Sequence, residues 1–226
     1  MTFSISGRCA ETGMLGIAIT TSSICVGSRC PWVRANVGAV STQNVTLPSI
    51  GTAVLDRIEV GQDAESSLKA VMDSEPHREF RQVTAIDRNG ATASFSGRET
   101  LGTHNISHGS NCVAAGNLLA DENLPHVMTG TFASAEGTHL AERLLRSLEA
   151  GLNKGGGERG PVHSAALLVT ESYGWPIVDL RVDWADDCPL QQLRRLWNDY
   201  QPQMQDYLTR ALNPNAAPSY GVPGDE

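Results

Sequence analysis

The sequence predicts an α+β fold in which two mainly antiparallel sheets lie between layers of helices. The chain begins with a predicted hairpin, because apolar and polar residues alternate over residues 3–10 and again over residues 14–22, with a short polar turn between them. An Asn89-Gly90 pair, a strong signal for a two-residue hairpin turn, separates two further β-like runs. The predicted helices come in pairs between groups of strands, so they can cover sheet faces. A single sheet with helices on one face is the alternative.

The first third of the chain is predicted to continue with a loop, a strand and a helix. Residues 23–32 are rich in small residues and predict the loop. Residues 33–42 predict a third strand, in which Gly38 allows another backbone to approach closely. A helix is expected over residues 47–59, because Pro48 falls in the first turn, where proline is tolerated.

The middle of the chain alternates between predicted helices and strands. Asp63 is expected to cap a second helix over residues 64–74. Residues 97–110 are polar and rich in Gly and His, which predicts a surface loop. Leucines fall on one side of the helix that is predicted over residues 138–152. The later strands are expected at residues 80–87, 91–96, 111–118, 163–170 and 177–182, and the later helices at residues 123–135 and 138–152.

The end of the chain is predicted to be one long helix followed by a tail. Residues 190–212 carry the longest helical pattern, and Pro202 inside it predicts a kink or break because proline lacks a backbone N–H. Residues 213–226 contain no apolar core, so we expect a loose tail. The chain is therefore expected to form one domain over residues 1–212 with a C-terminal tail, residues 213–226.

Composition and charge narrow the classes of function. Of the 226 residues, 40% are hydrophobic and 19% are charged, and the net charge is −8. This acidic balance argues against binding to nucleic acid or to an anionic membrane surface. Five cysteines without a CxxC pair indicate free thiols in a reducing compartment. Neither a signal peptide nor a long apolar run is recognisable, so we expect a cytoplasmic protein.

Short segments distributed over about residues 1–200 carry a resemblance to a known family. They are residues 2–5, 11–13, 15–18, 26–28, 31–32, 38–40, 42–43, 81–83, 116–119, 140–145, 164–169 and 178–183. Together they resemble domain of unknown function 1028, a family assigned to the N-terminal-nucleophile (Ntn) hydrolase superfamily. The resemblance implies a four-layer αββα sandwich. It does not imply a particular substrate, because a fold does not determine a reaction.

Thr2 is the first candidate catalytic residue. The resemblance implies that a threonine exposed by removal of Met1 attacks an amide carbonyl while its own α-amine takes up the proton. A free α-amine titrates near neutral pH, which suits a general base. Proteasome-type relatives place a lysine near the nucleophile, whereas the first lysine of this chain is Lys69. The alternative is that Thr2 merely starts a strand, for which a β-branched residue is ordinary.

Asn117 is the second candidate catalytic residue. It follows Gly116 at the end of a predicted strand, where its side-chain amide could donate a hydrogen bond to an oxyanion. The same position is equally consistent with a left-handed turn, which asparagine tolerates.

Several further residues are candidate substrate ligands. Ser22, Ser28 and Gln43 belong to segments that follow predicted strands and could line a cleft near Thr2, where their hydroxyl and amide groups could orient a substrate carbonyl. For any single one of them, turn chemistry is the better explanation. Arg159 and His163 flank the end of a glycine-rich loop and could hold a substrate carboxylate.

Two other sets of side chains are weaker candidates. Cys25 lies in a loop with Gly and Ser and is the second candidate nucleophile, although a cysteine between apolar residues is more often a small packing group. His104 and His108 are four residues apart in a polar loop without an HExxH-type spacing, so no metal site is predicted. No cofactor is implied.

We therefore expect an Ntn-type hydrolase of a small amide or related C–N bond, with Thr2 as nucleophile. The alternative is a non-catalytic ligand-binding or oligomeric accessory protein on the same fold. The expected partners are a small-molecule substrate and a second copy of the chain in a homodimer, with no nucleic acid and no membrane.

Overall fold

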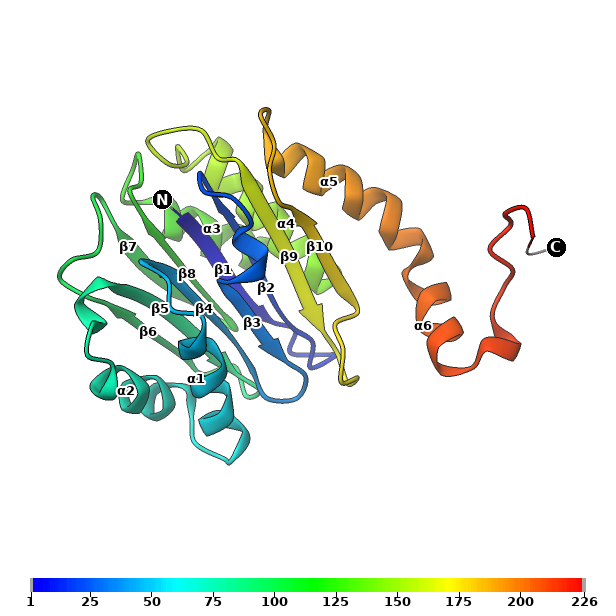
Figure 1. Cartoon of the computed structure of the whole chain (residues 1–226), viewed down its shortest axis with the longest axis horizontal. Helices are drawn as coiled ribbons and strands as arrows, with labels where there is room; N and C mark the ends of the chain where they lie inside the picture. The colour runs from blue at the N-terminus through cyan, green and yellow to red at the C-terminus, as the bar shows by residue number, and fades with distance from the viewer. Residues whose placement is uncertain (1, 225–226) are drawn as a thin grey trace.

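The opening hairpin forms the middle of the larger of two antiparallel sheets in the computed structural model, which describes residues 2–224 (Figure 1). Strands β1 (Thr2–Arg8) and β2 (Leu15–Thr21) pair from Thr2 opposite Thr21 to Arg8 opposite Leu15. The strand order is β10-β9-β2-β1-β8-β7. The remaining strands of this sheet are β7 (Asn105–Gly109), β8 (Cys112–Asn117), β9 (Ser164–Thr170) and β10 (Val178–Val182). The prediction of a hairpin at the start of the chain is thus confirmed.

The smaller sheet has the order β3-β4-β5-β6 and corrects one prediction. The single strand expected over residues 33–42 is two strands joined by a tight turn at Asn36, whose φ of 60° is left-handed. Asparagine tolerates this conformation, so the turn needs no glycine. The strands are β3 (Pro31–Arg34), β4 (Gly38–Asn44), β5 (Arg81–Asp87) and β6 (Thr92–Ser96), the last two forming the hairpin predicted at Asn89-Gly90.

Two pairs of helices pack on different sheets. Helices α1 (Ser49–Glu59) and α2 (Ala64–Ser74) share an apolar cluster with the smaller sheet. The predicted cap of α2 is confirmed, because Asp63 Oδ1 accepts a hydrogen bond from the Ser66 N–H at 2.7 Å. Helices α3 (Leu124–Ser134) and α4 (Leu140–Asn153) pack on the larger sheet in a second apolar cluster. A third cluster lies between the two sheets and includes Leu15, Ile17, Ile19, Ala39, Ile86 and Ala166.

The surface loop predicted over residues 97–110 is wrong for its second half, where β7 forms an edge strand. The sequence shows no clear apolar alternation there, because the side chains of β7 face polar groups. The His108 ring nitrogens lie 2.7 Å from the Thr92 hydroxyl and 2.9 Å from the Ser94 hydroxyl of β6, the edge strand of the other sheet. The edge strands of the two sheets are therefore joined by polar side chains.

The long C-terminal helix is broken at the predicted proline. Helix α5 (Pro189–Tyr200) and helix α6 (Met204–Leu212) are separated by a short 3-10 turn that contains Pro202. Leu208 of α6 is buried in the core cluster of the larger sheet, whereas in Figure 1 the chain from α6 to residue 224 extends away from the sheets. Over residues 213–224 the predicted tail forms only the 3-10 turn Pro214–Ala216, and residues 225–226 lie outside the described chain.

Residues 2–224 contain no helix with both the length and the apolar character required to cross a membrane.

Candidate active site

Strand β1 buries polar side chains on the face that points to the smaller sheet. Thr2, Ser4 and Ser6 alternate with Phe3 and Ile5, and none of the five is more than 5% exposed. Phe3 and Ile5 belong to the core beneath α3 and α4, so the period of two places the three hydroxyls between the sheets. A buried polar group without a partner costs about 1–3 kcal/mol, so this face is not an ordinary core face.

A chain of hydrogen bonds crosses from one sheet to the other at this face. Ser4 Oγ donates to Gln43 Oε1 at 2.7 Å, and Gln43 Nε2 donates to Gln82 Oε1 at 2.7 Å. Asn117 Nδ2 donates to the same Gln82 oxygen at 3.0 Å. The chain therefore joins β1 and β8 of the larger sheet through β4 and β5 of the smaller one, and it includes the predicted residues Gln43 and Asn117.

Thr2 lies where this polar face reaches the end of the sheet. It is the first residue of β1 and is 5% exposed, with Thr21 of β2 opposite it on one side and Asn117 of β8 opposite it on the other. The Thr2 and Thr21 hydroxyl oxygens are 3.1 Å apart. The structure thus brings the two predicted catalytic residues together. Met1, whose removal the hypothesis requires, lies outside the described residues.

Glu158 is a site residue that sequence reasoning missed. It follows the glycine run after α4, pairs with Leu119 through an isolated β-bridge, and is 6% exposed. Burial raises the pKa of its carboxyl group to about 8, although Ser22 lies close enough for its N–H and hydroxyl to favour the charged form. Among residues 2–224, neither carboxylate oxygen meets a donor in good hydrogen-bond geometry. A lone acid directly after three glycines was the available sequence signal.

The position of Glu158 follows from the segments that it touches. Ser22 comes directly after β2, and Leu119 lies two residues beyond the end of β8. Strand β1 lies between β2 and β8, so the loop carrying Glu158 spans the end of the sheet at which Thr2 begins. In Figure 1 this loop, between α4 and β9, passes over the same end of the sheet.

Arg159 and His163 lie on the same loop, but their side chains bind neighbouring segments of the protein and not the position expected for a substrate. Arg159 Nε donates to the Leu119 carbonyl at 3.3 Å and its Nη2 donates to the Thr103 hydroxyl at 3.1 Å. His163 Nδ1 lies 2.8 Å from the Ala185 carbonyl, and its ring stacks on Trp184 with centroids 4.4 Å apart. The Arg159 contacts fix the loop next to β7 and β8, and the His163 contacts fix it next to β10.

Ser28 and Cys25 lie together in another turn. Cys25 adopts a left-handed φ of 55° at the start of the 3-10 helix Val26–Ser28, and Ser28 Oγ donates to its carbonyl at 2.8 Å. The Cys25 side chain is half-buried. The hydroxyl of Ser28 therefore serves turn formation, the alternative that its sequence position allowed.

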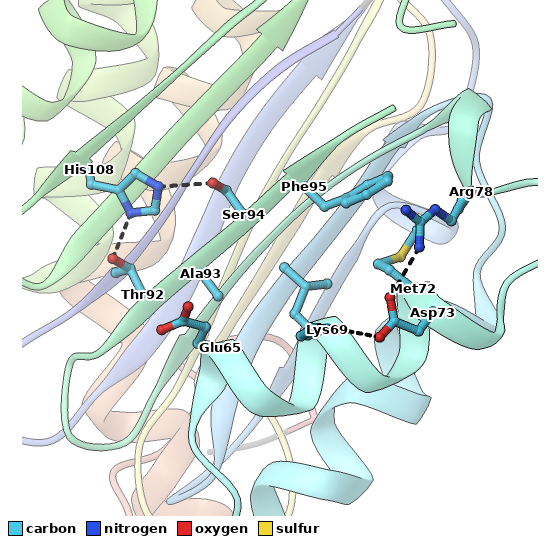
Figure 2. A pocket seen from close by; sticks show the side chains of 11 residues that line it. Glu65, Lys69, Met72, Asp73, Arg78, Thr92, Ala93, Ser94, Phe95 and His108 are labelled. Atoms are coloured by element: carbon cyan, nitrogen blue, oxygen red, sulfur yellow. Dashed lines mark hydrogen bonds and ion pairs between the residues drawn. The ribbon is translucent and has the colours of Figure 1, made fainter. Parts of the chain in front are cut away.

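A pocket of about 580 Å³ lies elsewhere, between α2 and β6. Most of its polar side chains bind one another, as Figure 2 shows: Asp73 pairs with Lys69 and Arg78, and His108 lies between Thr92 and Ser94. Its lining includes the buried side chains of Leu68 and Met72.

The end of the sheet at Thr2 differs from this pocket, because the Asn117 Oδ1 and both Glu158 oxygens lack a well-aligned donor among the described residues. Unsatisfied buried groups point to chemistry more directly than volume does, so we place the candidate active site at Thr2.

Comparisons with known proteins agree with the resemblance on the family. The sequence model of DUF1028, a family of unknown function, matches residues 2–193. A crystal structure of a DUF1028 protein from Silicibacter pomeroyi is 31% identical, with a TM-score of 0.81, over 88% of this chain and 89% of that chain. No curated protein matches the sequence.

Two more distant structures were also matched. Anbu (ancestral β-subunit) from Yersinia bercovieri is 8% identical over 91% of this chain and 97% of that chain, with a TM-score of 0.40. A Gly-1 mutant of Anbu from Hyphomicrobium sp. strain MC1 is 13% identical over 90% of this chain and 96% of that chain, with a TM-score of 0.42. Scores this low do not establish a common fold.

Proposed function

The chain belongs to DUF1028, a family of unknown function, and we propose that this member is an Ntn hydrolase acting on a small amide or related C–N bond. The observation that carries the proposal is the setting of Thr2. This residue starts a buried central strand, at the end of a polar layer, beside acceptors that no described donor satisfies. We also assign the two sheets and their outer helices to the four-layer αββα sandwich, an assignment supported by the two separate helix-to-sheet clusters.

In the proposed reaction, Thr2 Oγ1 attacks the amide carbonyl carbon after Met1 has been removed, and the hydroxyl proton passes to the Thr2 α-amine. The tetrahedral intermediate collapses as the C–N bond breaks, and the α-ammonium group returns the proton to the leaving amine. Water then hydrolyses the resulting ester with the same amine as base. These steps consume one water and release an acid and an amine.

Asn117 takes a different role in this proposal from the one expected of it. Its Nδ2 already donates to Gln82, and the atom without a partner is the acceptor Oδ1. An acceptor cannot stabilise an oxyanion, so we assign Asn117 to orienting Thr2 and assign the oxyanion to backbone N–H groups. Ser22 remains the proposed substrate-side ligand. Gln43, whose amide bonds Ser4 and Gln82, joins the two sheets, while Arg159 and His163 hold the loop in place.

Intact mass spectrometry provides the first test, because the mechanism requires an N-terminal threonine. We expect the mass of the purified protein to lack one methionine residue. The mature protein is then screened against a panel of small amides alongside Thr2→Ala and Thr2→Ser. We expect Thr2→Ala to lose at least about 100-fold in turnover and Thr2→Ser to keep measurable activity, because serine retains the hydroxyl.

Thr20→Ala is the matched control. Thr20 is a neighbouring buried threonine whose hydroxyl donates to the Ser164 carbonyl, so its loss tests stability without touching the proposed nucleophile. Retention of Met1 in the active preparation, or equal turnover of wild type and Thr2→Ala, would contradict the hydrolase. A protein that binds members of the panel without cleaving them would instead support the non-catalytic alternative.

A further inference from the structure

Three buried hydrogen-bond acceptors near the start of β1 have no donor in good hydrogen-bond geometry among residues 2–224. They are the Asn117 Oδ1 and the two carboxylate oxygens of Glu158. Asn117 is fully buried and Glu158 is 6% exposed, so water cannot reach them freely. An unpaired buried acceptor destabilises the fold, and an unpaired buried carboxylate destabilises it more. Such a cluster indicates a cationic donor that completes it.

We propose that this donor is the α-ammonium group of Thr2, and that Glu158 is the positioning residue for the amine that serves as the catalytic base. The inference deepens the proposed function and rests on it in one respect, since it requires that Met1 is removed. An α-ammonium group carries three N–H donors, which matches the three unsatisfied acceptors. Asn117 lies opposite Thr2 in the strand register, and the Glu158 loop spans the same end of the sheet.

The chemistry of the base explains why a carboxylate is useful there. When the Thr2 hydroxyl gives its proton to the α-amine, a positive charge develops on that nitrogen. Burial alone would keep the Glu158 carboxyl group protonated at neutral pH, but the positive charge on the amine favours its ionised form. The resulting carboxylate stabilises this charge and holds the amine in one orientation, as the acid does in a nucleophile–base–acid triad. Glu158 needs to accept no proton itself, so the proton balance of the reaction is unchanged.

Glu158 is the acidic side chain of this loop, and the other polar side chains around it are engaged in other contacts or are neutral. The Arg159 guanidinium donates to Leu119 and Thr103, and the His163 ring contacts Ala185 and Trp184. Ser22 contributes neutral donors that favour the charged carboxylate. Within residues 2–224 Glu158 forms no ion pair with another side chain, so an N-terminal ammonium group is the remaining source of a counter-charge.

The test uses the full chain with Thr2 as its first residue, produced by cleaving an N-terminal fusion directly before Thr2. The protein carries ¹⁵N-threonine, and the pKa of the Thr2 α-amine is measured by NMR titration. An ordinary α-amine has a pKa of about 7.7–8.0. We expect the wild-type value to lie at least one unit higher, and Glu158→Gln to remove at least about one unit of that increase. Glu122→Gln, which removes one exposed carboxylate from the segment between β8 and α3, should leave the pKa within about 0.3 units.

The wild-type titration decides the question even if Glu158→Gln fails to fold, because an ordinary amine pKa in wild type overturns the inference. An equal shift in Glu158→Gln and Glu122→Gln overturns it as well. The two proposals fail separately. A raised amine pKa in a protein that cleaves no amide would retain the Glu158 contact and remove the hydrolase. Thr2-dependent cleavage with an ordinary amine pKa would retain the hydrolase and remove Glu158 from it.

Discussion

Asn117 Nδ2 donates to Gln82 Oε1 across the gap between the two sheets, with the two atoms 3.0 Å apart. The same oxygen also accepts from Gln43 Nε2, and the Gln82 amide donates to the Ser96 hydroxyl and the Gly116 carbonyl, each at 3.1 Å. Gln82 is fully buried. The Gln82 side chain therefore satisfies polar groups from both sheets and fixes the side chain of Asn117, the residue opposite Thr2.

Gln82→Met is expected to destabilise the protein by about 3 kcal/mol, because it leaves the Gln43 and Asn117 amides buried without an acceptor. Urea unfolding followed by circular dichroism measures the change. Gln205→Met, at an exposed position of α6, is the control and should change the free energy of unfolding by less than about 0.5 kcal/mol. A loss below about 1 kcal/mol in Gln82→Met would mean that water replaces the lost contacts.

Gly51→Ala is expected to destabilise the protein although alanine favours helices over glycine by up to about 1 kcal/mol. A Cβ at Gly51 in α1 would lie 2.1 Å from the Trp32 Cδ1 of β3, which is far inside contact distance. We expect a net loss of about 1–2 kcal/mol in urea unfolding. The same substitution in a Trp32→Ala background should be neutral or stabilising. A loss of equal size in both backgrounds would show that the tryptophan ring is not the cause.

The fold was largely predictable wherever the signal was local. The period-two alternation of β1 and β2, the Asn89-Gly90 turn, the Asp63 cap and the break at Pro202 all depend on neighbours in the chain, and the structure confirms each of them. Strand β7 was missed because its pattern depends on a partner in another sheet: His108 is polar and faces the hydroxyls of β6.

The candidate site was predictable only in part, for the same physical reason. Thr2, Asn117 and Gln43 stand in or at the ends of strands, where alternation and position already single them out. Glu158 and Gln82 become notable through burial and through contacts with distant segments. Glutamate after a glycine run is usually an exposed loop residue, so the glycines before Glu158 mark the position but do not show that its carboxylate is buried.

Glu142→Gln is expected to lower stability by about 2 kcal/mol at pH 7, because the Glu142 carboxylate of α4 accepts charge-assisted hydrogen bonds from Arg146 and Arg194. Burial alone would raise the pKa of Glu142, but these bonds outweigh it and hold the pKa below its usual range. A lowered folded-state pKa contributes stability above the unfolded value, about 4.3, and this contribution is lost as the pH falls through the folded-state pKa.

The gap between wild type and Glu142→Gln should therefore shrink as the pH of urea unfolding is lowered from about 5 towards 3. Glu136→Gln removes an exposed carboxylate two residues beyond α3 and is the control, with little change at any pH. A gap that stays constant over this range would assign the loss to changed packing and not to the charge of Glu142.

Arg143 is a buried arginine of α4 whose guanidinium contacts Phe132 of α3. Its Nε and Nη2 donate to the Phe132 carbonyl at 3.4 and 3.1 Å, and its Cζ lies 4.0 Å from the centre of the Phe132 ring. Arg143→Lys keeps the charge but loses the planar fork and places a more strongly hydrated ammonium group in the core. We expect a loss of about 1–2 kcal/mol in the free energy of unfolding.

Arg146→Lys is the matched control for Arg143→Lys, because Arg146 lies on the same helix, is half-exposed and donates to Glu142. A lysine can keep that exposed ion pair, so the change there should stay within about 0.5 kcal/mol. Phe132→Leu in both backgrounds then isolates the ring contact, with an expected coupling of about 0.5–1 kcal/mol to Arg143 and none to Arg146. Equal losses in Arg143→Lys and Arg146→Lys would show that the guanidinium contributes only its charge.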